Sequence, residues 1–73
     1  MDNNLFLCKV GLKIKILREM KKWSQEKLAE KAETSAPYIG TIERGEQNPS
    51  LMLLKKIADA FEIDIKELFN FVI

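Results

Sequence analysis

Apolar residues recur every three or four positions along most of the chain, the spacing that gathers them on one face of a helix. Val10, Ile14 and Leu17 predict a first helix over residues 9–22. Ser24 is a suitable N-cap for a second, shorter helix. No alternating run typical of a strand interrupts the pattern, so the predicted fold class is all-α.

Three further helices are predicted from capping residues and apolar spacing. Thr34 or Ser35 can cap a third helix, and Ser50 can cap a fourth. Asp64 and Glu67 resemble a capping box that opens a fifth helix. The buried face of the fourth helix is predicted to be Leu51, Leu54, Ile57, Ala58 and Phe61.

The second and third helices are joined by a turn of three or four residues, which is the helix-turn-helix pattern. Gln25 begins the first of the two helices, and Ser35 or Ala36 begins the second. Ile39 and Ile42 are predicted to lock the second helix against the first. The residues then left on its outer surface are Ala36, Pro37, Tyr38, Thr41 and Arg44.

The segment from Ser24 to Leu51, SQEKLAEKAETSAPYIGTIERGEQNPSL, looks like the Cro/phage-repressor family of helix-turn-helix proteins, which is XRE-like. The resemblance extends from about Gly11 to Phe69 and implies a lambda-repressor-like DNA-binding domain. The Tyr-Ile and Ile-Glu-Arg elements at 38–39 and 42–44 are similar to those of short stand-alone regulators, which include controller proteins of restriction-modification systems.

The organisation predicted from the spacing and this resemblance is one compact five-helix bundle over residues 1–73. Its core spans about residues 11–69, preceded by a short N-terminal arm over 1–8 and followed by an apolar tail over 70–73.

The resemblance also implies roles for single residues. Gln25 would hold a DNA phosphate with its amide and the positive end of the helix dipole. Arg18 and Glu43 match a pair that forms a partly buried salt bridge in family members. The positions near base edges or the flanking DNA backbone are Ser35, Ala36, Pro37, Tyr38, Thr41 and Arg44.

Each of these assignments has a plainer alternative. Gln25 can be a solvated residue in the first turn of a helix, and Tyr38 can be a ring that covers the edge of the core. Arg18 and Glu43 can be independent surface charges, whose coupling would stay below about 1 kcal/mol.

The chain departs from the family pattern in the turn and in the recognition helix. Glu33 stands where glycine is frequent, so either it adopts a left-handed conformation at a cost of about 1 kcal/mol or the turn differs. Ala36 and Pro37 stand where relatives often present glutamine or arginine, and neither side chain can hydrogen-bond a base. Readout is therefore expected to depend on Thr41, Arg44 and DNA shape.

A second apolar stripe lies beside the core-facing stripe of the first helix. Leu12 and Ile16 occupy positions that are usually charged in the family. We expect the segment 5–7 or the tail 69–73 to fold back over this stripe within one chain. The alternative is a protein partner docked at Leu12, Ile16 and Met20.

The chain is 47% hydrophobic, which is high for 73 residues and favours an apolar surface reserved for a partner. We expect a homodimer, because two-fold symmetry allows two half-sites on DNA to be engaged together. The predicted interface is the apolar C-terminal end, made of Leu68, Phe69, Phe71, Val72 and Ile73.

Charge is informative through its distribution, since the net charge is only +1. Residues 9–22 hold six basic residues and the single acid Glu19, whereas acids predominate over residues 59–67. This asymmetry fits a basic surface for DNA, and the alternative is two solvated helix faces.

Catalytic and metal chemistry is not expected. The chain has no histidine, and its one cysteine, Cys8, has no neighbouring base or second thiol in the sequence. We therefore expect no enzyme activity, no cofactor and no metal site. The lone thiol, the short uncharged runs and a start unlike a signal peptide favour a cytoplasmic protein without membrane association.

The predicted function is sequence-specific transcription regulation by a homodimer on a roughly palindromic DNA operator, with the recognition helix over about 35–44 in the major groove. Two alternatives stay open. One is an antitoxin-like protein-interaction module with secondary DNA binding, and the other is a structural helical module that has lost DNA binding.

Overall fold

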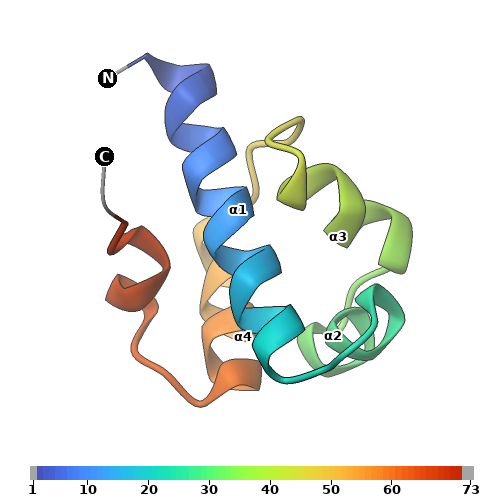
Figure 1. Ribbon diagram of the computed structural model, residues 1–73. Helices are drawn as coiled ribbons and strands as arrows, with labels where there is room; N and C mark the ends of the chain where they lie inside the picture. Colours follow the sequence, from blue (N-terminus) through green and yellow to red (C-terminus); the bar gives the residue numbers. More distant parts are fainter. Residues whose placement is uncertain (1, 72–73) are drawn as a thin grey trace.

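The computed structural model describes residues 2–71, which form four α-helices and one short 3-10 helix (Figure 1). The elements are α1 (Asn3–Met20), α2 (Gln25–Ala32), α3 (Ala36–Glu43), α4 (Leu51–Phe61) and η1 (Ile65–Phe69). No strand occurs within this range, which confirms the all-α fold, although the fifth element is a single 3-10 segment and not an α-helix. None of the helices in residues 2–71 has the length and hydropathy of a membrane span.

The helices begin where polar side chains can accept the free amide protons of a first turn. The hydroxyl oxygens of Ser24, Ser35 and Ser50 accept from amides three residues on, at 3.0, 3.3 and 3.0 Å. These three caps are confirmed. The carboxylate of Asp64 caps η1 by accepting from the amide of Lys66 at 3.1 Å.

Helix α1 begins at Asn3, so the prediction of an N-terminal arm over residues 1–8 is wrong for the described part of that segment. Asp2 caps the helix by accepting from the amide of Leu5 at 2.9 Å. Farther along, Cys8 packs against Gly45, where an added Cβ would meet the Cys8 Sγ at 2.6 Å. Gly45 also has a positive φ of 74°. The loop after α3 thus lies directly on the second turn of α1.

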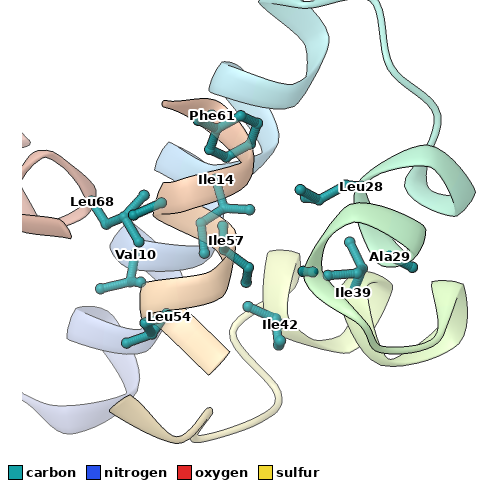
Figure 2. Packing of buried hydrophobic residues seen from close by; sticks show 12 residues of the cluster. Val10, Ile14, Leu28, Ala29, Ile39, Ile42, Leu54, Ile57, Phe61 and Leu68 are labelled. Atoms are coloured by element: carbon teal, nitrogen blue, oxygen red, sulfur yellow. The ribbon is translucent and has the colours of Figure 1, made fainter. Parts of the chain in front are cut away.

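Helix α2 packs against both α3 and α4, α1 packs against α3, and η1 packs against α1 and α4, so the buried side chains of all five elements meet in one core (Figure 2). Helix α1 approaches α3 closely at Gly11, where a Cβ would meet the backbone carbonyl of Ile42. The core is made of Val10, Ile14, Leu28, Ala29, Ala32, Ile39, Ile42, Leu54, Ile57, Ala58, Phe61 and Leu68.

Leu68 requires a correction, because its side chain is fully buried in this core. It cannot also be part of a dimer interface, and its place on η1 explains why: this segment closes the core over α1 and α4. Phe69 and Phe71 instead lie against Phe6 of α1, with ring centroids 6.2 and 6.1 Å apart.

The turn between α2 and α3 has a left-handed residue at Glu33, which is one of the two geometries that the sequence left open. Glu33 is left-handed, with φ 59° and ψ 45°, and ends α2. The next amide, that of Thr34, donates to the carbonyl of Ala29 at 2.9 Å, which closes the helix end. The fold therefore tolerates a non-glycine residue here at a cost of about 1 kcal/mol.

The expectation that the chain covers its own second stripe is wrong for residues 5–7, and the described residues of the tail cover the stripe only in part. Residues 5–7 belong to α1 and so cannot fold back over it. Phe71 lies near the stripe, yet Leu12 remains 53% exposed and Ile16 44% exposed. Val72 and Ile73 of the predicted tail and interface lie outside the described residues.

Candidate nucleic-acid interface

Helix α3 divides its residues between the core and an outer surface. Ile39 and Ile42 are buried against the rest of the domain. Among the other residues of the predicted site, Ser35, Pro37 and Arg44 are exposed and Thr41 is half-buried, whereas Ala36 and Tyr38 are half-buried and pack against the core. Pro37 costs no hydrogen bond in this first helical turn, because the amide it lacks would be unpaired.

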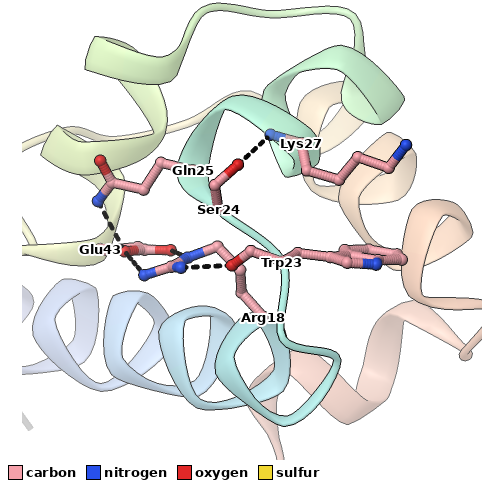
Figure 3. A network of polar contacts seen from close by, with 6 residues as sticks. All are labelled: Arg18, Trp23, Ser24, Gln25, Lys27 and Glu43. Carbon is pink, nitrogen blue, oxygen red and sulfur yellow. Dashed lines mark hydrogen bonds and ion pairs between the residues drawn. The ribbon is translucent and has the colours of Figure 1, made fainter.

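Three helices are joined at the base of α3 by one buried carboxylate, that of Glu43 (Figure 3). The guanidinium of Arg18 on α1 donates to it through Nε and Nη2, at 2.7 and 3.2 Å. Gln25 on α2 donates to the same carboxylate through Nε2 at 3.0 Å. Arg18 also donates to the carbonyl of Trp23 at 2.7 Å. The network fixes α3 relative to α1 and α2.

The geometry of the pair is that of a charge-assisted double hydrogen bond. The side chains of Arg18 and Glu43 are only 11% and 3% exposed. The hydrogen bond to Glu43 raises the pKa of Arg18 above its usual value, against the opposing effect of burial. Both groups therefore face each other in a desolvated setting and are not independent surface charges.

Gln25 is placed by the network and still keeps binding capacity. Its amide nitrogen carries two hydrogens, and only one is needed for the bond to Glu43. The second N–H and the first amides of α2 lie at the positive end of that helix. This is the arrangement that favours an anion such as a phosphate.

Thr41 donates its hydroxyl proton to the carbonyl of Tyr38 at 2.7 Å. In this rotamer the oxygen can only accept a further hydrogen bond, and the methyl group can contact an apolar atom. Tyr38 itself is half-buried and packs against the core, in line with the plainer interpretation of its ring.

Arg44 ends α3 and is paired within the free protein. Its Nε donates to Glu46 at 3.0 Å, with both side chains more than half exposed. This hydrogen bond raises the pKa of Arg44. A DNA phosphate or guanine edge approaching Arg44 would have to compete with Glu46, a neighbour that the sequence patterns did not single out.

Gly40 is a second residue that sequence reasoning missed. A Cβ at this position would lie 3.2 Å from Arg44 Nη1 and 3.5 Å from Gln25 Oε1. The missing side chain thus leaves room for Gln25 and Arg44 to lie side by side on the outer surface. The sequence did offer a signal, which is a glycine in the interior of a short helix. Glycine destabilises a helix there, so its presence indicates that a neighbouring group needs the space.

A family model for helix-turn-helix proteins, HTH_3, matches residues 14–68 of this chain. The chain belongs to this helix-turn-helix family. It is 40% identical over 72 residues to the control protein C.BamHI of Bacillus amyloliquefaciens, covering 97% of this chain and 88% of that protein. The immunity repressor protein of Bacillus phage phi105 is 45% identical over 56 residues, or 77% of this chain and 39% of the repressor.

Among solved structures, the restriction-modification controller protein C.AhdI from Aeromonas hydrophila superposes with a TM-score of 0.85. It is 41% identical, and the match covers 86% of this chain and 96% of C.AhdI. These relatives confirm the resemblance to repressors and controller proteins, and they are regulators and not enzymes. What this chain shares with these regulators is therefore the helix-turn-helix domain.

Several relatives are considerably longer than this chain. The chain spans 39% of the phage repressor and 56% of the regulator SinR of Bacillus licheniformis. The shared part is in each case the helix-turn-helix domain, since the family model covers most of the matched region.

Proposed function

We propose that this protein is a sequence-specific transcriptional regulator that binds a roughly palindromic DNA operator as a homodimer, with α3 in the major groove. The observation that carries the proposal is the network at Glu43, which joins α3 to α1 and holds Gln25, at the start of α2, beside α3. The similarity to control protein C.BamHI over nearly the whole chain supports a stand-alone regulator. We place its action in the cytoplasm, where the exposed thiol of Cys8 would stay reduced.

Base readout on this surface depends on few groups. Ala36 and Pro37 can touch thymine methyl groups or fill space, but they offer no hydrogen bond to a base. Thr41 contributes an acceptor oxygen and a methyl group, and Arg44 contributes the guanidinium that suits guanine or phosphate. Ser35 and Tyr38 lie at the start of α3, where they would approach the DNA backbone that flanks the contacted bases. DNA shape then supplies the rest of the specificity.

The homodimer proposal rests on the aromatic cluster at the C-terminal end. Phe69 is 37% exposed and stacked on Phe6, which is 40% exposed. Two stacked aromatic rings that are both partly exposed to solvent form a suitable apolar centre for a two-fold contact. Regulation by protein concentration then follows, because two half-sites require two subunits.

Selection of bound sites from a random duplex pool tests the DNA proposal. The expected product is a two-fold symmetric site with two half-sites. The variant Thr41→Ala should relax one or two positions of each half-site, whereas Gln25→Ala should weaken binding to all sequences equally. A selected pool without any shared sequence, or an unchanged half-site for Thr41→Ala, contradicts the readout model.

Sedimentation tests the interface. The variant Phe69→Ala should give a folded monomer with weaker operator binding, and Met52→Ala, which truncates another exposed apolar residue, should stay dimeric. If Phe69→Ala remains a dimer while it is folded, the interface lies elsewhere.

The exposed stripe at Leu12, Ile16 and Met20 favours one second function, protein binding of the antitoxin-like kind. The two functions use different surfaces, so a chain can have both. A salt titration of binding to random duplex DNA separates a DNA-binding regulator from a module without DNA binding. The affinity of a DNA-binding regulator falls steeply as salt rises, because it depends on contacts with phosphates.

A further inference from the structure

Two apolar hollows lie along α1 on its solvent side. The first has a volume of about 350 Å³ and is lined by Lys9, Leu12, Lys13, Ile16, Asn70 and Phe71. The second has a volume of about 360 Å³ and is lined by Leu17, Met20, Lys21, Phe61 and Ile63. Each has a floor of aliphatic and aromatic side chains, and we refer to the pair as the α1 grooves.

The charges around the α1 grooves are of one sign. Lys9 and Lys13 border the first groove and Lys21 borders the second, and among residues 2–71 no carboxylate lines either groove. Lys9 lies over the ring of Phe71, with Nζ 5.8 Å from the centroid, so its charge is held at the groove edge. Glu19 is exposed on the same helix but lines neither groove.

The spacing of the α1 grooves matches the anchors of a helix. Leu12 and Met20 are eight residues apart on α1, which at about 1.5 Å per residue is about 12 Å. Apolar residues about seven or eight positions apart on a second helix have nearly the same separation. One amphipathic helix lying along α1 could therefore place one side chain in each groove.

This face is separate from the proposed DNA surface. Gly11 and Arg18 of α1 contact α3, Gly11 through the α3 backbone and Arg18 through Glu43. Leu12 and Ile16 lie more than about 90° around the helix from them, at about 100° per residue, and are exposed.

A second copy of this chain is a poor occupant. In a symmetric contact the same patch meets itself, so the lysines of one α1 would face the lysines of the other. Like charges brought together across an apolar contact oppose association, whereas carboxylates at those places favour it.

We propose that the α1 grooves bind an acidic amphipathic helix of a partner protein. The apolar side chains of that helix enter the two grooves, and its flanking carboxylates pair with Lys9, Lys13 and Lys21. The contact is compatible with operator binding, because it leaves α3 free.

A displayed library of helical peptides, selected against the full chain, tests the proposal. The enriched peptides should carry two apolar residues about seven or eight positions apart, flanked by Asp or Glu. By fluorescence anisotropy, Leu12→Ser and Met20→Ser should each weaken a selected peptide about tenfold or more. Lys13→Glu should also weaken peptide affinity, and this loss should be larger at low salt than at high salt.

Matched controls come from the same chain. Lys15→Glu makes the same charge change on α1 outside the grooves, and Met52→Ser removes from α4 an apolar side chain whose exposure lies between those of Leu12 and Met20. Each control should keep peptide affinity within about twofold. An unchanged circular dichroism spectrum and an unchanged thermal unfolding midpoint show that each variant is folded. Selected peptides without acidic flanks, or equal losses in Lys13→Glu and Lys15→Glu, overturn the proposal. It is also overturned if Leu12→Ser dissociates a dimer of the chain in sedimentation, since a second copy then occupies the face.

Discussion

The pair of Arg18 and Glu43 gives the sharpest test of how this fold supports its function. Replacing Arg18 by Met keeps an unbranched apolar stem but removes the guanidinium, which leaves Glu43 with the amide of Gln25 as its hydrogen-bond partner. Removing one member of a buried pair costs about 3 kcal/mol or more, compared with about 0.2–1 kcal/mol for an exposed pair. The 3% exposure of the Glu43 side chain places it in the first class.

A double-mutant cycle measures the interaction. Arg18→Met, Glu43→Leu and the double variant are unfolded in urea and followed by Trp23 fluorescence, since this ring stacks on Phe61 in the core at 5.6 Å. Each single variant should lose about 3 kcal/mol, and the double variant should lose clearly less than the sum, with a coupling above about 1 kcal/mol. Losses that add within about 0.5 kcal/mol would refute the buried pair.

The raised pKa of Arg18 also predicts how its contribution to stability depends on pH. The pKa of Arg18 is raised in the folded protein, so its contribution is complete below the unfolded-state pKa and is lost only as pH rises through the still higher folded-state pKa. The stability that Arg18 contributes should therefore be constant from about pH 6 to 9.

Operator affinity should stay low in the double variant even where stability recovers, because Gln25 has lost the carboxylate that positions it.

The other predictions concern two glycines and one acid. Gly11→Ala should cost about 3 kcal/mol of unfolding free energy in urea, because its methyl group meets the backbone of α3. Gly40→Ala should keep the circular dichroism spectrum and thermal stability but weaken operator binding in an anisotropy titration, because its methyl group crowds the guanidinium of Arg44. Glu46→Gln should strengthen DNA binding about two- to fivefold, since it frees Arg44 and removes a negative charge; unchanged affinity would mean that Arg44 does not reach DNA.

The local parts of the fold were predictable from the sequence. The three serine caps act within one turn of their own helix, so residue type and position are sufficient to find them. The start of α1 was missed because residues 3–8 have no buried apolar face of their own to give a periodic signal. They are held by Asp2 and by the packing of Cys8 on Gly45, a contact between segments far apart in the sequence.

The C-terminal end shows a different limit. Leu68 and Phe69 are adjacent and both apolar, yet Leu68 is fully buried and Phe69 is 37% exposed. Apolar character alone cannot distinguish a residue that closes the core from one that offers a contact surface. The distinction depends on how the short 3-10 helix turns back onto α1 and α4, and that follows from packing.

In the candidate site, the resemblance supplied the positions and the structure supplied their dependence on one another. Glu43 serves Arg18 and Gln25 at once, so the group that joins α1 to α3 also orients the proposed phosphate contact. Substitutions at this carboxylate should thus change stability and DNA affinity together, whereas Gly40 and Glu46 adjust the surface with little effect on the core. The domain therefore separates a rigid support, built around one buried carboxylate, from an outer surface whose few contacts can change without cost to the fold.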